Sequence, residues 1–135
     1  MKSPDLKKLF KENKVIAVVG LSPNPARDSH RVALYMQRQG YRIIPVNPTV
    51  DEVLGERSYP NLTAIPEKVD VVDVFRRPEE VVPIAKEAVA IKAKVLWLQD
   101  GVVNHEAAAI AEQGGLDVVM DDCMLRQHGR LMREE

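Results

Sequence analysis

The sequence is poor in several residue types, and each shortage narrows the folds and functions open to it. A single cysteine, Cys123, excludes an internal disulfide framework and a zinc site built from several cysteines. Aromatic residues make up 4% of the 135 residues, too few for a stacking platform that binds single-stranded nucleic acid. Neither sign of charge dominates, because 19 Lys and Arg residues face 20 Asp and Glu residues. We therefore expect no nucleic acid as a partner.

Long hydrophobic runs are also missing. Runs such as residues 15–19 have the length of a strand and are far too short to cross a membrane. The basic residues 1–14 lack the apolar segment of a secretion signal. With 45% apolar and 29% charged residues, the composition is typical of a globular protein, and the length fits one domain over residues 1–135. We expect a cytoplasmic protein with no membrane partner.

Apolar runs that suit buried strands alternate with segments of helical periodicity. The expected strands cover residues 15–19, 41–46, 69–75, 94–98 and 116–120. The expected helices between and after them cover residues 29–39, 78–91, 104–113 and 123–130. Residues 49–68 form a longer connection, with one short helical turn near residues 61–63. The alternation predicts a single doubly wound, Rossmann-like α/β domain, with five parallel strands in the order 3-2-1-4-5 and helices on both faces.

In such a sheet, ligands bind outside the carboxyl ends of the strands, beside the first strand. The first loop there has Gly20 but carries Ser22 and Pro25 where a dinucleotide fingerprint needs glycine. Arg27, the hydroxyls of Ser22 and Ser29, and the first amides of the following helix could hold a phosphate instead. An ordinary loop with an exposed arginine fits the same residues.

The ends of the next three strands add uncharged and basic groups. NAD enzymes place an acid after the second strand, whereas this sequence has Asn47 there. This difference weakens the case for NAD as the ligand. An uncharged Asn47 also tolerates a ligand with a phosphorylated ribose. A simple turn at residues 47–48 is the alternative interpretation. Phe75 and Arg76 follow the third strand and could contact a ring and a phosphate. Gln99 follows the fourth strand and could bind an amide.

Several stretches together carry a family resemblance. The most specific is Tyr-x-x-x-Pro-Val-Asn-Pro at residues 41–48. The others are residues 16–22, 54–55, 59–60, 71–76, 95–99 and 122–124. With these stretches the chain resembles, over nearly its whole length, the small single-domain CoA-binding proteins, which are similar to the CoA-binding domain of succinyl-CoA synthetase and of NDP-forming acyl-CoA synthetases.

The resemblance implies coenzyme A or an acyl-CoA as the cofactor, with its phosphates on the loop of residues 20–29. It implies that the end of the second strand borders the adenosine, and that the ends of the third and fourth strands flank the nucleotide or the pantetheine arm. The expected binding residues are Gly20, Leu21, Ser22, Arg27, Ser29, Val46, Asn47, Pro48, Phe75, Arg76, Leu98 and Gln99. Thr49 stands where members of that family often carry Lys or Arg, so one implied phosphate contact is missing at that position.

No catalytic constellation is evident. His30, His105, His128 and Cys123 have no partner that the sequence places beside them, and the acids do not have the spacing of a metal site. We therefore expect non-catalytic binding of CoA or acyl-CoA by a carrier, sensor or adaptor. The alternatives are an NAD(P)-dependent oxidoreductase, an acyl-CoA enzyme that needs a partner, and a ligand-free interaction module.

Three further points concern partners and probes. A protein partner or a homodimer remains open. Cys123 is either a buried structural thiol or a thiol that forms a mixed disulfide with CoA. Trp97, in the fourth strand, is expected to lie near the crevice and to sense a ligand by its fluorescence.

Overall fold

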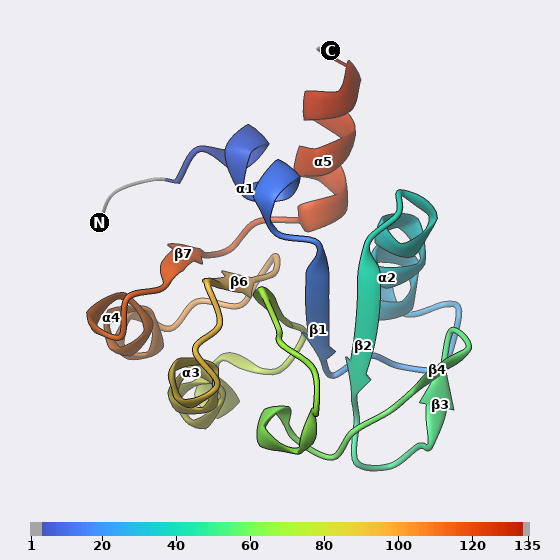
Figure 1. The fold of residues 1–135 in the computed structure, drawn as a ribbon, viewed down its shortest axis with the longest axis horizontal. Coiled ribbons are helices and arrows are strands. Elements are labelled where there is room, and N and C mark those ends of the chain that lie inside the picture. Colours follow the sequence, from blue (N-terminus) through green and yellow to red (C-terminus); the bar gives the residue numbers. More distant parts are fainter. Residues whose placement is uncertain (1–3, 134–135) are drawn as a thin grey trace.

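The fold is built on a parallel sheet, as the apolar runs predicted. The computed structural model describes residues 4–133. The five strands of the main sheet, in spatial order, are β2 (Arg42–Val46), β1 (Val15–Val19), β5 (Val71–Val74), β6 (Val95–Leu98) and β7 (Asp117–Val119) (Figure 1). Each strand begins and ends within two residues of the expected bounds. The α/β class, with five parallel strands and helices on both faces, is confirmed.

The position of one strand in the sheet needs a correction. The pattern 3-2-1-4-5 is present, but the segment that lies beside β2 at the edge of the sheet, as number 3 of the pattern, is the one at Tyr59. This segment makes one parallel bridge to Val46. The expected third strand, β5, lies on the other side of β1, where Val18 pairs with Asp73. The bridge is short because Pro45 has no N–H, so this edge of β2 offers an incomplete ladder. Tyr59 donates to the Pro45 carbonyl at 3.1 Å.

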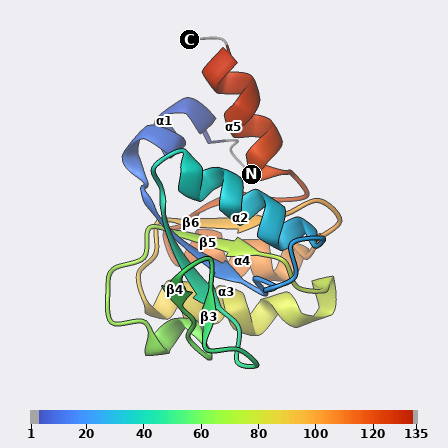
Figure 2. The same cartoon turned by 90° about the vertical axis from the view of Figure 1, so that its right-hand side faces the viewer.

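Two layers of helices cover the sheet (Figure 2). On one face lie α3 (Val81–Ala90), preceded by the 3-10 turn η2 (Pro78–Glu80), and α4 (His105–Gln113). Their buried residues are mainly alanines, which lets the helices pack closely. Gly114 follows α4 and also serves this contact, since a Cβ there would lie 2.5 Å from a methyl group of Val89.

The other face carries α1 (Leu6–Glu12), α2 (Asp28–Arg38) and α5 (Met124–Arg133). Trp97 is completely buried beneath them, and its indole N–H donates to the Asp122 carbonyl at 2.9 Å. The ring of Phe10 lies against the indole, with 5.6 Å between ring centroids. His128 is buried nearby, and its Nδ1 lies 2.8 Å from the Tyr35 hydroxyl. Trp97 is therefore a core residue and does not border the crevice, contrary to expectation.

The long connection after β2 contains more structure than expected. A hairpin of β3 (Glu52–Val53) and β4 (Glu56–Arg57) precedes the short helical turn η1 (Leu62–Ala64). Leu54 and Gly55 form its turn, and both have positive φ, 56° and 76°. Such turns usually contain Asn-Gly or Asp-Gly, so the hairpin was not predicted from Leu-Gly. This segment brings η1 to the carboxyl end of the sheet.

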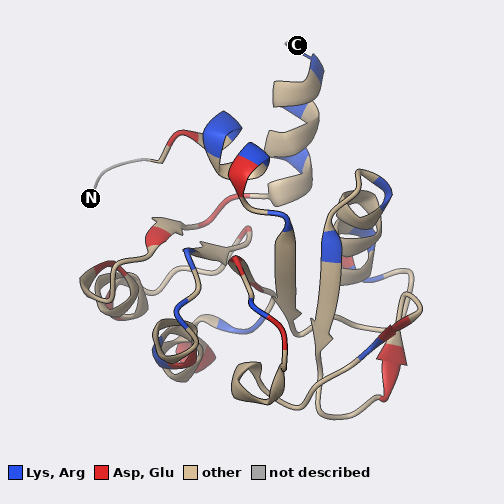
Figure 3. Ribbon diagram, in the orientation of Figure 1, with Lys and Arg blue, Asp and Glu red and all other residues tan. Residues whose placement is uncertain are grey.

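Charges of both signs are spread over the molecule, with Lys and Arg prominent on α1 and α5 (Figure 3). Within residues 4–133, no helix combines the length and apolar character needed to cross a membrane.

Candidate functional site

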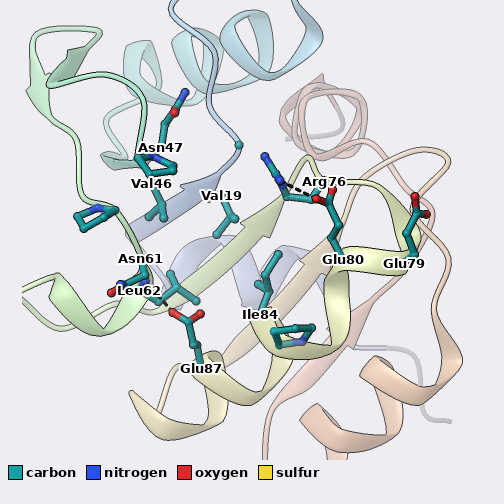
Figure 4. Close-up of a pocket in the computed structure, with 14 residues that line it drawn as sticks. Val19, Val46, Asn47, Asn61, Leu62, Arg76, Glu79, Glu80, Ile84 and Glu87 are labelled. Atoms are coloured by element: carbon teal, nitrogen blue, oxygen red, sulfur yellow. Dashed lines mark hydrogen bonds and ion pairs between the residues drawn. The ribbon is translucent and has the colours of Figure 1, made fainter.

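Three adjoining pockets lie where the carboxyl ends of β1, β2, β5 and β6 meet. Pocket A, about 490 Å³, lies between the end of β2, η1 and α3 (Figure 4). Pocket B, about 330 Å³, lies between α2, η2 and the residue before α5. Pocket C, about 540 Å³, lies along the loop of residues 20–29. Gly20 lines A and C, Phe75 lines B and C, and Arg76 lines A and B, so the pockets form one continuous crevice.

Gly20 stands at the centre of the crevice. Its N–H donates to the Val46 carbonyl at 2.9 Å, and the Phe75 N–H donates to the Val19 carbonyl at 2.9 Å. These bonds extend the ladders of three strands to one point. The φ of Gly20 is +88°, and a Cβ on it would lie 2.6 Å from the Phe75 oxygen. Only glycine fits here without strain, and the backbone therefore comes directly to the floor of pockets A and C.

The loop of residues 20–29 is held in shape by its own polar groups. The Ser22 N–H donates to the buried Ser29 hydroxyl at 3.0 Å, which leaves the Ser29 O–H as a donor. The Asn24 N–H in turn donates to the Ser22 hydroxyl at 3.1 Å. The loop is therefore set before any ligand arrives.

Arg27 is the cation of pocket C. It occupies the N-cap of α2, and its side chain makes no capping hydrogen bond to the first amides of the helix. Within residues 4–133 it has no ion-pair partner, unlike Arg31, which lies 3.4 Å from Asp28. A helix N-terminus without a capping side chain, an unpaired guanidinium and two hydroxyls together form a donor set for an anion. The exposed carboxylate of Asp28 also lines pocket C and would repel a bound anion.

Asn47 holds two loops of the crevice together. Its Nδ2 donates to the Leu21 carbonyl at 3.0 Å, and its Oδ1 accepts from the Thr49 N–H at 3.0 Å and hydroxyl at 2.7 Å. Its Oδ1 is thus occupied within the protein, and one N–H of its Nδ2 remains. Thr49 stands where the family that the chain resembles often carries Lys or Arg, and its N–H and hydroxyl both donate to Asn47 Oδ1.

Arg76 separates pockets A and B. Its Nη2 lies 2.7 Å from Glu80 Oε1, and its side chain is 43% exposed (Figure 4). Arg77 and Arg76, through hydrogen bonds to the carboxylate, lower the pKa of Glu80 below its usual value. This exposed pair can exchange its partner for a ligand anion at little cost.

Pocket B has an apolar wall with a polar inner end. Phe75, Val32 and Val102 line it, together with Cys123, which is 7% exposed, and Gln99. Gln99 Nε2 donates to Asp73 Oδ1 at 2.6 Å. Burial raises the pKa of Asp73 to about 7, although the Gln99 hydrogen bond acts in the opposite direction. Asp73 was not predicted as a site residue, since its only signal in the sequence is an acid within the apolar run of β5.

The structure brings most of the expected residues together. The expected residues that line the pockets are Gly20, Ser22, Arg27, Ser29, Val46, Asn47, Pro48, Phe75, Arg76 and Gln99. Leu21 and Leu98 do not line them, because both side chains are fully buried in the two hydrophobic cores.

Pocket A also has walls made of residues that were not predicted from the sequence. They come from η1 and the two residues before it, from η2 and from α3, and consist of Pro60, Asn61, Leu62, Glu79, Glu80, Pro83, Ile84 and Glu87. Glu87 is tied to η1, because its Oε1 accepts from the Leu62 N–H at 3.0 Å. His30 and His105 line none of the three pockets. Across residues 4–133 there is no group of three or more His, Cys, Asp or Glu side chains suited to a metal ion.

Comparison with known proteins assigns the family. The chain is 44% identical over 124 residues to uncharacterized protein YneT of Bacillus subtilis strain 168, and the match covers 92% of each protein. It is 30% identical over 122 residues to acetate–CoA ligase (ADP-forming) I of Archaeoglobus fulgidus, covering 82% of this chain and 18% of the ligase. A hypothetical protein from Pyrococcus horikoshii OT3, whose structure is solved, has a TM-score of 0.94 and 39% identity, covering 98% of this chain and 93% of that one.

The family model described as CoA binding domain matches residues 14–129. This range includes all four strand ends that line the crevice. The resemblance found in the sequence is confirmed, and the chain belongs to the CoA binding domain family.

Proposed function

We propose that the protein binds coenzyme A or an acyl-CoA in the crevice, without catalysing a reaction, as a carrier, sensor or adaptor. The observation that carries the proposal is the unpaired Arg27 at the uncapped start of α2, beside the hydroxyls of Ser22 and Ser29. In this proposal pocket C takes phosphates of the ligand. Membership in the CoA binding domain family supports CoA over other phosphorylated ligands.

The two neighbouring pockets suit the two ends of such a ligand. Pocket A borders Val46, Asn47 and Pro48 and takes the adenosine, between apolar side chains such as Leu62 and Ile84. Pocket B borders Phe75 and Gln99 and takes the pantetheine arm. Arg76, between them, moves from Glu80 to a phosphate when the ligand binds.

The proposal extends to location and partners. It places the protein in the cytoplasm, as one CoA-binding domain over residues 1–135 that has neither nucleic acid nor membrane as a partner. The match to part of an acetate–CoA ligase supports a role with CoA esters, and this chain matches 18% of that ligase.

Calorimetric titration of nucleotide-stripped protein with CoA, dephospho-CoA and NAD tests the proposal. We expect saturable binding of CoA, weaker binding of dephospho-CoA, and about tenfold weaker CoA binding by Arg27→Ala, because a charge-assisted hydrogen bond is lost. Arg38→Ala, at the far end of the same helix, is the matched control and should bind as the wild type does.

Other outcomes would overturn the proposal. Binding of NAD alone would favour a dinucleotide-dependent oxidoreductase. Binding of none of the three would favour an interaction module. Equal CoA affinity for Arg27→Ala and Arg38→Ala would remove pocket C from the phosphate site.

A further inference from the structure

A chain of hydrogen bonds runs from the interior of the sheet to the wall of pocket B. Asp73 lies in the middle of β5, between Val18 of β1 and Trp97 of β6, and is 1% exposed. Gln99 Nε2 donates to Asp73 Oδ1 at 2.6 Å, and Gln99 Oε1 accepts from the Met124 N–H at 3.3 Å. An acceptor and a donor therefore fix the two ends of the Gln99 amide.

The carboxyl group of Asp73 has no evident packing role. Its neighbours in β5 are valines, and an apolar residue would fill the same place without the cost of burying a polar group. The hydrogen bond that the carboxyl group accepts comes from Gln99, through Oδ1. The buried carboxyl group therefore carries a cost in stability, and the residue it contacts, Gln99, lines pocket B.

We propose that Asp73 is a positioning residue that orients the Gln99 amide so that Gln99 can bind a secondary amide of the ligand in pocket B. This inference rests on the proposed function, because the pantetheine arm of CoA is the part of that ligand that contains secondary amides. Gln99 keeps a second N–H and a second lone pair for this contact. If the Asp73 contact were lost, only the 3.3 Å hydrogen bond from the Met124 N–H would hold the amide.

Ligand affinity in pocket B should depend on pH. The pKa of Asp73 is raised to about 7, so its charge changes near neutrality. When Asp73 gains a proton, its carboxyl group becomes a weaker acceptor, and the hydrogen bond from Gln99 weakens. Affinity for a ligand with the arm should therefore fall as the pH falls from 8 to 6.

Other charged groups around pocket B must be considered in that experiment. They are Asp28 and Arg31 on α2, Arg76 and Arg77 after β5, Asp100 after β6, Cys123 before α5, and Arg126 on α5, which pairs with Asp100 and Asp122. None of them contributes to the raised pKa of Asp73, which comes from burial, while the hydrogen bond from Gln99 lowers it. Asp73→Asn keeps all of them and removes only the one titration.

The test is the affinity for dephospho-CoA at pH 6, 7 and 8. This ligand lacks the phosphomonoester, which would itself titrate near pH 6. We expect wild-type affinity to fall severalfold from pH 8 to pH 6. Asp73→Asn should keep the wild-type pH 8 affinity throughout, because Asn Oδ1 still accepts from Gln99. Asp73→Leu should bind at every pH about tenfold more weakly than the wild type does at pH 8, the loss of roughly one hydrogen bond.

Controls separate orientation from folding. Gln99→Met should lose as much affinity as Asp73→Leu, and the double variant should lose no more. ADP, which has no arm, should bind equally to all variants, and thermal unfolding should show each variant folded at the assay temperature.

Two results would overturn the inference while leaving CoA binding intact. The first is equal dephospho-CoA affinity for the wild type and Asp73→Leu. The second is the same pH profile for the wild type and Asp73→Asn. Failure of the wild type to bind any of these ligands would instead refute the proposed function.

Discussion

The backbone of Gly20 lies so close to the carbonyl oxygen of Phe75 that a Cβ on Gly20 would be 2.6 Å from it. Gly20→Ala must therefore move β5 away from β1 or distort a residue whose φ is +88°. We expect a loss of about 2–4 kcal/mol in the free energy of unfolding, measured by urea denaturation. Gly55→Ala is the control, because its φ is +76° but nothing lies within 4 Å of its Cβ position. It should lose only about 1 kcal/mol, and equal losses would contradict the steric argument.

Asn47→Asp tests the link between the two loops of the crevice. The change removes the donor to the Leu21 carbonyl and puts a carboxylate oxygen near that carbonyl. We expect the free energy of unfolding to fall by about 1–3 kcal/mol. Asn61→Asp is a matched control, because the Asn61 side chain acts there only as an acceptor, from Ala64 N–H and the Thr63 hydroxyl. A large effect at Asn61 or none at Asn47 would refute this account.

The buried carboxyl of Asp73 should make stability depend on pH. Its pKa is about 7 in the folded protein against 3.8 for an unperturbed carboxyl, so the folded state binds the proton more tightly than the unfolded state. The stability contributed by the bound proton is present below pH 4 and is lost as the pH rises to about 7.

Asp73→Asn should lack this loss. Its free energy of unfolding, relative to the wild type, should rise between pH 4.5 and 7.5 by up to about 4 kcal/mol, because about three pH units separate the two pKa values. Urea denaturation across this range measures the difference. A difference that stays constant would mean that Asp73 does not titrate there.

Cys123 provides a chemical probe of pocket B. Its thiol lines the pocket and is 7% exposed, so alkylation in the native protein should be slower than in the unfolded chain. Saturating acetyl-CoA, which has no free thiol, should slow alkylation further, whereas ADP should not. Intact-mass analysis measures the rate, and the lack of any protection would argue against a ligand arm in pocket B.

The same residue allows a direct test of the mixed-disulfide hypothesis. After incubation with CoA disulfide, an adduct of CoA mass on Cys123 would support it. A thiol that remains free would end it.

The sequence predicted the strands and the location of the crevice because both depend on local patterns. Apolar runs such as residues 15–19 suit a strand buried on both faces, and parallel strands bring their carboxyl ends to one edge. The loop around Gly20 and the turn at Asn47 could thus be named in advance as neighbours.

The features that could not be predicted depend on register and on distant contacts. Whether Leu21 and Leu98 face a pocket or the core depends on how each strand ends. The pairing of Asp73 with Gln99 requires β5 and β6 to be neighbours in one particular register. The single bridge at Tyr59 is too short to leave a periodic signal.

Trp97 gives the protein an internal optical probe whose meaning follows from its position. It is the one tryptophan in the sequence, and it is sealed beneath α1 and α5 with its N–H bound to Asp122. Its emission should be blue-shifted in the native protein and should move to longer wavelengths when α1 and α5 detach. Fluorescence will therefore follow unfolding of the helical layer opposite α3 and α4, while binding in the crevice has to be followed by other means.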